Sequence, residues 1–352
     1  MKPIPHNRPL ICPEDRLAVD ATLVSGWIAQ GPSVAALEAE FVRYHAGGGA
    51  CAVSSGTSAL LLALKALGAG AGAEVVVPSY ACSALLNAVF MAGASPKVVD
   101  VLPDTFCMDP RAIQTQAPDA RFVFAVHTYG AMANVEAIKK QDKVVIEDCC
   151  QALGGTVSNV PLGGTGDAAV FSFYATKIIT GGQGGLVWSR DSAVAEKVRD
   201  YRQFDCRETY EPRFNFQMTD IQAALVNSQM TRLEAIRERR VHIAGSYIAA
   251  MPSGLSTQAS LLDPGRMAYR FVVVTPDRAV REALRTHFAT AGVECIVPIE
   301  RFELLHRYLK LDPTDYPISE CLADTTLSLP IHPCLSDEDV SVISNALYRF
   351  QS

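Results

Sequence analysis

The chain has 352 residues, and 31 Lys and Arg against 37 Asp and Glu give a net charge of −6. With 49% apolar and 19% charged residues, this is the composition of a folded chain of about two domains rather than of a disordered one. The acidic balance disfavours nucleic acid and anionic membranes as partners, and no apolar stretch reaches the ~20 residues that cross a bilayer. Because the N-terminal residues also contain no apolar signal core, we expect a cytoplasmic protein.

Residues 50–155 alternate short β-branched runs with helical patterns. We predict strands at 51–55, 74–79, 97–101, 122–127 and 143–148, and helices at 57–68, 81–93 and 135–140. Continuous apolar strands that alternate with helices are typical of an α/β protein, with a mostly parallel sheet sandwiched by helices. In such a sheet, ligands bind at the carboxyl ends of the strands.

The second half of the chain continues this pattern and then changes. Two further strands, 168–173 and 184–189, flank a glycine-rich loop, and a capping box at Thr219 begins a long helix predicted to reach about Met251. After the turn-rich segment 252–258, we predict strands at 270–275 and 293–297, a helix at 278–291 and a final helix after Ser336. This indicates a large domain at residues 1–250 and a smaller C-terminal α+β domain at residues 251–352.

Ten cysteines are spread along the chain, without a CxxC motif and without a cysteine–histidine pair at zinc spacing. In a protein expected in the cytosol, we interpret them as reduced thiols, most of them buried as small apolar side chains. A structural disulfide or a metal site is the less favoured alternative, so no metal is predicted.

Polar side chains follow several predicted strands, where ligands are expected. Residues 54–58 (SSGTS) begin a helix whose free N–H groups suit a phosphate, although serine and threonine there are also ordinary helix caps. Asp148 ends a buried strand, where a carboxylate either has a cationic or hydrogen-bonded partner or caps the next turn. Lys177 lies between an aromatic strand end and the glycine-rich loop 181–185, where a lysine with a lowered pKa can act as a nucleophile toward carbonyls.

Taken together and in this order, these motifs resemble the DegT/DnrJ/EryC1/StrS family of sugar aminotransferases. The resemblance runs from GWIAQGPSVAALEAEF through SSGTSALLLALKALG, VHTYG, VVIEDCCQALGG, GDAAVFSFYATK, TGGQGG and NFQMTDIQAAL to LADTTLSLPIHPCLSDEDV. It implies the pyridoxal-phosphate transferase fold of type I over nearly the whole chain. It also implies that an amino group moves from an amino-acid donor, usually glutamate, to a keto group of a nucleotide-linked sugar, through a pyridoxamine 5′-phosphate form.

The resemblance implies roles for three residues around the cofactor ring. Lys177 looks like the lysine that holds pyridoxal 5′-phosphate as a Schiff base and then moves the proton. Asp148 looks like the carboxylate beside the pyridinium nitrogen, where an anion keeps that nitrogen protonated and the cofactor an electron sink. Gln151 resembles the residue that lies near the ring and its hydroxyl group.

The phosphate and the substrate side complete this expectation. Gly56, Thr57 and Ser172 resemble the cup for the cofactor phosphate. Asn215 resembles the asparagine that reaches the phosphate of the partner subunit, which implies a homodimer with shared active sites. The substrate-side candidates are Tyr80, His127 and His306. His127 can equally be a packed, hydrogen-bonded histidine.

Four positions depart from the family pattern while the cofactor residues are intact. Cys82 stands where many members have an aromatic over the cofactor ring, and Gln183 stands where many have glutamate. Phe204 replaces a frequent histidine, and Gln217 replaces a frequent arginine. Because these positions surround the expected substrate side, they leave the sugar and the donor open.

Three alternatives differ in reaction or class. Relatives that dehydrate sugars have a histidine where Lys177 stands, so that reaction is disfavoured. Relatives that act on cyclitols or aminobenzoate precursors keep the lysine and are not excluded. A regulatory protein on an inactive aminotransferase fold is disfavoured by the acidic charge and by the intact set of Asp148, Ser172 and Lys177.

Overall fold

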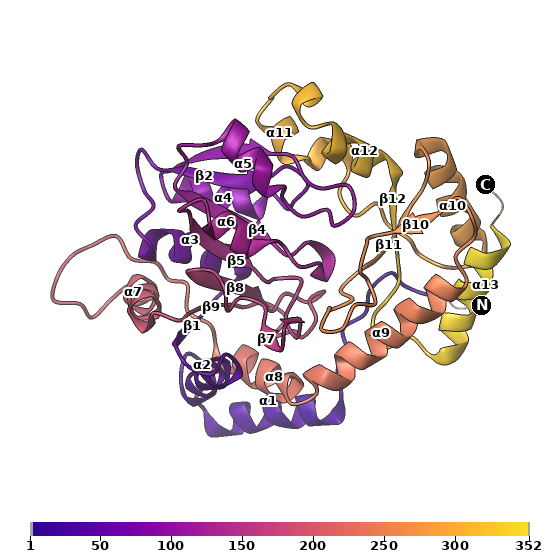
Figure 1. The fold of residues 1–352 in the computed structure, drawn as a ribbon. Coiled ribbons are helices and arrows are strands. Elements are labelled where there is room, and N and C mark those ends of the chain that lie inside the picture. The colour runs from indigo at the N-terminus through magenta and orange to yellow at the C-terminus, as the bar shows by residue number, and fades with distance from the viewer. Residues whose placement is uncertain (1–2, 351–352) are drawn as a thin grey trace.

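A seven-stranded sheet forms the centre of the computed structural model, which describes residues 3–350 (Figure 1). Its strand order is β1-β9-β8-β5-β4-β2-β3. The strands are β1 (Gly49–Val53), β2 (Glu74–Pro78), β3 (Ser95–Val99), β4 (Phe122–Val126), β5 (Val144–Asp148), β8 (Ala168–Ser172) and β9 (Gly185–Ser189). Neighbouring strands are parallel, except that β9 is antiparallel to both β1 and β8. This confirms the predicted mostly parallel, mixed sheet.

Helices cover both faces of this sheet because successive strand residues point to opposite sides and both sets are apolar. Cys51 and Val53 of β1 pack with helices α3 (Gly56–Ala66), α4 (Ala84–Met91) and α7 (Ser192–Arg202). Ala50 and Ala52 face the other way. That side is covered by α2 (Pro32–Tyr44), α5 (Pro110–Gln116), α6 (Val135–Lys139) and α8 (Asp220–Met230), and α1 (Pro13–Ser25) packs against α8.

A second, antiparallel sheet consists of β10 (Ser256–Thr257), β11 (Phe271–Val274) and β12 (Thr326–Leu329). Its apolar core is shared with α9 (Leu233–Ala249), α10 (Arg278–Thr290) and α13 (Asp337–Arg349), and α13 begins at the predicted Ser336 cap. The remaining elements are the hairpin β6 (Thr156–Val157) and β7 (Val160–Pro161), and the helices α11 (Leu305–Tyr308) and α12 (Pro317–Thr325). The division into domains at residue 250 stays a prediction.

The single long helix predicted from Thr219 to Met251 is wrong, because it is interrupted between α8 and α9. The Thr231 hydroxyl donates to the carbonyl of Ser228, and the backbone N–H of Arg232 donates to Gln229 three residues earlier. These contacts replace helical hydrogen bonds and form a turn. The Arg232 guanidinium also binds the buried Asp15 carboxylate of α1 at 2.8 Å.

The strand predicted at 293–297 is also wrong as a continuous element. Val293 pairs with Ile4 of the N-terminal segment, whereas Ile296 pairs with Ser328, and both contacts are isolated bridges. Because successive residues bond to different partners and Pro298 has no backbone N–H, no regular ladder forms. Among the residues described, no helix has both the length and the apolar character needed to cross a bilayer.

Candidate active site

A cavity of about 240 Å³ lies at the carboxyl ends of the central parallel strands. Asp148 at the end of β5 and Val126 at the end of β4 line it, together with residues 80–83 after β2 and residues 174, 176 and 177 after β8. Tyr269 and Arg270, just before β11, line the cavity from the second sheet. The location agrees with the expectation for a mostly parallel sheet, because all of its strands except β9 end at this edge.

Lys177 reaches the cavity from a turn that follows β8, in which its backbone N–H donates to the carbonyl of Tyr174. Its Nζ atom lies 5.5 Å from the centre of the Tyr269 ring. Burial alone would lower the pKa of Lys177, but the charges of Tyr269, Cys150 and Asp148 outweigh it and raise the pKa. The expected lowering is therefore wrong for this structure, because the acidic neighbours favour the ammonium form.

Asp148 and Gln151 line the same cavity on the β5 side. The Oδ1 atom of Asp148 accepts a hydrogen bond of 3.0 Å from the N–H of Cys150, which leaves the carboxylate held at the strand end. The Gln151 Oε1 atom accepts from the N–H of Tyr129 at 2.9 Å. Both side chains are thus oriented by backbone groups, and both can face a planar ligand.

The start of α3 forms the second part of the candidate site. The Ser55 side chain caps this helix by accepting from the N–H of Ser58, which confirms the ordinary-cap interpretation for that one residue. The first helical residues, Gly56 and Thr57, still present N–H groups that need a partner outside the helix. A Cβ atom on Gly56 would lie 2.9 Å from the Ser172 Cβ, so only glycine leaves this cradle open. Such a cradle fits a phosphate group.

Asn215 is exposed and does not line the cavity. It belongs to the segment between α7 and α8, part of which extends away from the body of the chain before it returns (Figure 1). Its neighbour Phe216 accepts a hydrogen bond of 2.8 Å from the N–H of Ser54, and Phe214 stacks on Phe216. The Asn215 side chain is therefore available to another molecule rather than to this cavity.

Tyr80 and Cys82 follow β2 and both line the cavity. Tyr80 is fully buried, and its hydroxyl group lies 3.0 Å from the Oγ1 atom of Thr326 and 3.4 Å from the hydroxyl group of Tyr129. Cys82 is exposed. Tyr80 therefore supports the wall through its hydroxyl contacts, and Cys82 presents a small side chain to the opening.

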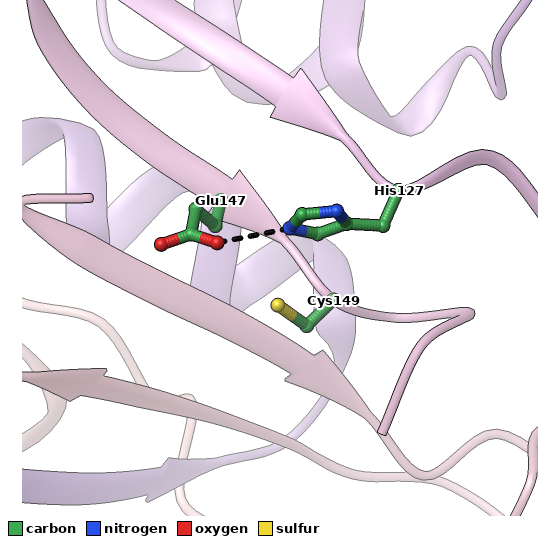
Figure 2. Close-up of side chains that lie close together, drawn as sticks. All are labelled: His127, Glu147 and Cys149. Atoms are coloured by element: carbon green, nitrogen blue, oxygen red, sulfur yellow. Dashed lines mark hydrogen bonds and ion pairs between the residues drawn. The ribbon is translucent and has the colours of Figure 1, made fainter. Parts of the chain in front are cut away.

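His127 is buried outside the cavity and belongs to a hydrogen-bonded cluster with Glu147 (Figure 2). Its Nδ1 atom accepts from the N–H of Ala133 at 3.1 Å, so Nε2 carries the proton and donates to Glu147 Oε2 at 2.9 Å. The Glu147 carboxylate also accepts from the N–H groups of residues 163, 165 and 166. Burial would raise the pKa of Glu147, but His127 and these N–H groups lower it.

This arrangement corrects the substrate-side expectation for His127 and supports the packed-histidine interpretation. His127, Glu147 and Cys149 have potential metal-ligand atoms within 4.8 Å of one another (Figure 2). Both ring nitrogens of His127 are already engaged, however, and the carboxylate has four donors. Burial and the nearby Glu147 and Asp148 charges also raise the pKa of Cys149, which favours its protonated thiol. We assign the cluster to the structure of the strand ends.

His306 is likewise buried outside the cavity. Its Nδ1 atom lies 2.6 Å from the Ser79 hydroxyl group, and its Nε2 atom lies 2.9 Å from Glu320. The ring also stacks on Tyr316, with 4.3 Å between ring centres. The ring of His306 is thus fully enclosed by protein, and both of its nitrogens have partners. The expectation that His306 faces the substrate is therefore corrected as well.

Sequence reasoning missed Tyr269 and Arg270 as cavity residues. They precede an ordinary apolar strand in the segment predicted as a separate domain, and the rule about strand carboxyl ends does not point to them. A tyrosine and an arginine immediately before β11 are the only sequence signal, and that signal is weak.

The model of the DegT/DnrJ/EryC1/StrS aminotransferase family matches residues 9–348. The chain belongs to this family. It is 32% identical to the spore coat polysaccharide biosynthesis protein SpsC of Bacillus subtilis, over 98% of this chain and 96% of the relative.

Solved structures of aminotransferases have the same fold as this family member. Spr1654 of Streptococcus pneumoniae, assigned as a sugar aminotransferase and solved in a PLP form, is 26% identical with a TM-score of 0.91 over 98% of both chains. The same protein has also been solved in a PMP form. The aminotransferase TlmJ from Streptoalloteichus hindustanus is 28% identical with a TM-score of 0.89 over 98% of both chains. The protein is thus a PLP-dependent aminotransferase, with pyridoxamine phosphate as the other cofactor form.

Proposed function

We propose that this aminotransferase moves an amino group from an amino acid, glutamate in the first instance, to a keto group of a nucleotide-linked sugar. The observation that carries the proposal is that Lys177 and Asp148, from two different strand ends, line one cavity. The names of SpsC and Spr1654, which refer to polysaccharide biosynthesis and to a sugar aminotransferase, support the substrate class.

In this proposal, each part of the site binds one part of the cofactor. Lys177 Nζ binds the cofactor covalently and is the group placed to accept and return a proton. Asp148 would hold the ring nitrogen, and Gln151 would contact the ring. The N–H groups of Gly56 and Thr57 bind the phosphate together with the Ser172 hydroxyl. When bound, the cofactor supplies an electron sink for the carbon that exchanges its amino group.

We further propose a homodimer in the cytosol, in which Asn215 reaches the cofactor phosphate of the partner subunit. The exposure of the Asn215 side chain supports this. Sedimentation of the purified protein gives the oligomeric state. Mixing inactive Lys177→Ala with inactive Asn215→Ala subunits is expected to restore part of the activity if the sites are shared, and a mixture without activity argues against sharing.

The covalent role of Lys177 is tested by absorbance. Purified protein with pyridoxal phosphate is expected to absorb in the visible range, and Lys177→Ala is expected to lose this absorbance. Lys140→Ala, which replaces an exposed lysine, is the matched control. Retention of the band in Lys177→Ala would refute the role.

The reaction is tested by incubating the enzyme with glutamate and a panel of keto compounds and measuring the mass change of each. We expect amination of a keto nucleotide sugar. Amination of a keto cyclitol alone would replace the proposed substrate class with the cyclitol alternative, and failure of every keto compound would overturn the proposal.

A further inference from the structure

The cavity contains one cation besides Lys177, and that cation is Arg270. Its Nη1 atom donates to the Ser328 hydroxyl at 3.3 Å. Its guanidinium carbon lies 5.7 Å from the ring centre of Tyr129 and 5.6 Å from that of Tyr269. Two aromatic rings and a hydroxyl group therefore orient the guanidinium without neutralising it.

Among residues 3–350, no carboxylate forms an ion pair with Arg270, and the Ser328 contact is its one side-chain hydrogen bond. An arginine has five N–H donors, so most of them remain free for a ligand. The positive charge of Arg270 helps to lower the pKa of Tyr269. Burial, and to a smaller extent the Arg270 charge, lowers the pKa of His6 to about 3. A half-buried, oriented and unpaired guanidinium in a ligand cavity is suited to bind an anion.

The position of Arg270 relative to Lys177 indicates which anion Arg270 can bind, the carboxylate of an amino acid or the diphosphate of a nucleotide sugar. Both cations lie within 6 Å of the same Tyr269 ring, Lys177 at 5.5 Å and Arg270 at 5.6 Å. In an α-amino acid, the carboxylate is bonded to the very carbon that carries the reacting amino group. In a nucleotide sugar, by contrast, the diphosphate is separated from a keto carbon by atoms of the sugar ring. An anion site beside the reacting lysine therefore matches the amino acid better.

We propose that Arg270 binds the α-carboxylate of the amino donor, and that this contact selects amino acids over simple amines. The proposal deepens the proposed function and rests on it, because it places the donor beside Lys177. The planar guanidinium can form two parallel hydrogen bonds with a carboxylate, a geometry that lysine cannot reproduce. Arg270 is thus a specificity-determining residue for the half-reaction with the donor.

The test measures only the half-reaction with the amino donor. Its readout is the change in cofactor absorbance when the cofactor-loaded enzyme takes up the amino group. Arg270→Met is expected to raise the glutamate concentration for half-maximal conversion by about 10- to 100-fold, and Arg270→Lys is expected to recover only part of this loss. Arg121→Met is the matched control, because Arg121 also lies over an aromatic ring, at 5.6 Å from Phe122, but outside the cavity.

A simple alkylamine separates carboxylate recognition from a structural effect. It has no carboxylate, so its slow conversion is expected to be the same in wild type and in Arg270→Met. Equal loss with glutamate and with the alkylamine would overturn the proposal, as would an unchanged glutamate dependence. A loss confined to the keto-sugar half-reaction would instead assign Arg270 to the diphosphate and also overturn it. If wild type accepts no amino group from any amino acid, the proposed function itself fails.

Discussion

The substitution Gly56→Ala tests the candidate phosphate site without removing any polar group. Gly56 is the first residue of α3, and a Cβ atom there would lie 2.9 Å from the Ser172 Cβ, 3.1 Å from its Oγ and 3.4 Å from the Cys150 sulfur. Because the nearest atom is a Cβ rather than the flexible end of a side chain, either Ser172 or the helix start must shift. The shift displaces the hydroxyl group from the position proposed to bind the phosphate.

The size of the effect follows from the hydrogen bond at risk. A hydrogen bond to a charged group contributes about 1.5–3 kcal/mol, which corresponds to roughly 10- to 150-fold weaker binding of pyridoxal phosphate. The dissociation constant is measured by titrating cofactor-free enzyme and following absorbance. Gly245→Ala is the control, because Gly245 lies within α9 and its added Cβ would meet no atom within 4 Å. Equal cofactor affinity in Gly56→Ala and wild type would refute the reasoning.

Two further predictions concern buried titratable groups outside the cavity. Burial lowers the pKa of His45 to about 4, and its ring stacks on Trp188, with no hydrogen bond to either nitrogen from residues 3–350. Since the unfolded chain then binds a proton that the folded chain does not, this site costs stability as pH falls below about 6.5, on the order of 2 kcal/mol between pH 7 and 5. His45→Phe should flatten that pH dependence in urea unfolding, and an unchanged slope would contradict it. Glu147→Gln should cost about 2–4 kcal/mol at pH 7 in the same assay, because an amide N–H then faces the donors that surround the carboxylate. Its control, Glu136→Gln at an exposed position, should cost nothing measurable, and equal stability of the two variants would refute the role of the cluster.

The candidate site was predictable where it depends on strand ends. Asp148 and Lys177 are 29 positions apart, but Asp148 ends β5 and Lys177 follows β8, and these two strands are neighbours in one mostly parallel sheet. The carboxyl ends of such strands meet at one edge, so the pattern of apolar runs already predicts that the two side chains approach each other. The same rule predicts that Gly56, which follows β1, lies at this edge of the sheet.

The strand-end rule did not predict the positions of His127 and His306. His306 is held by Ser79, which is 227 residues away in the sequence, and by Glu320. Burial and partners at such separations depend on how the two sheets pack, which no local pattern encodes. The missed Arg270 has the same origin, because it enters the cavity from the second sheet rather than from a strand end of the first.

Glu147 and Asp148, at the end of β5, contribute one side chain to the buried cluster and one to the cavity. Because successive strand residues face opposite sides, Glu147 enters the buried cluster while Asp148 enters the cavity. The backbone N–H of His127 donates to the carbonyl of Asp148 at 3.1 Å, and the His127 side chain binds Glu147. The end of β4 therefore holds the end of β5 through two separate contacts. The Asp148 carboxylate, proposed to hold the cofactor ring, thus stands on a strand end that is anchored from its opposite face, which gives the two adjacent acidic residues separate roles.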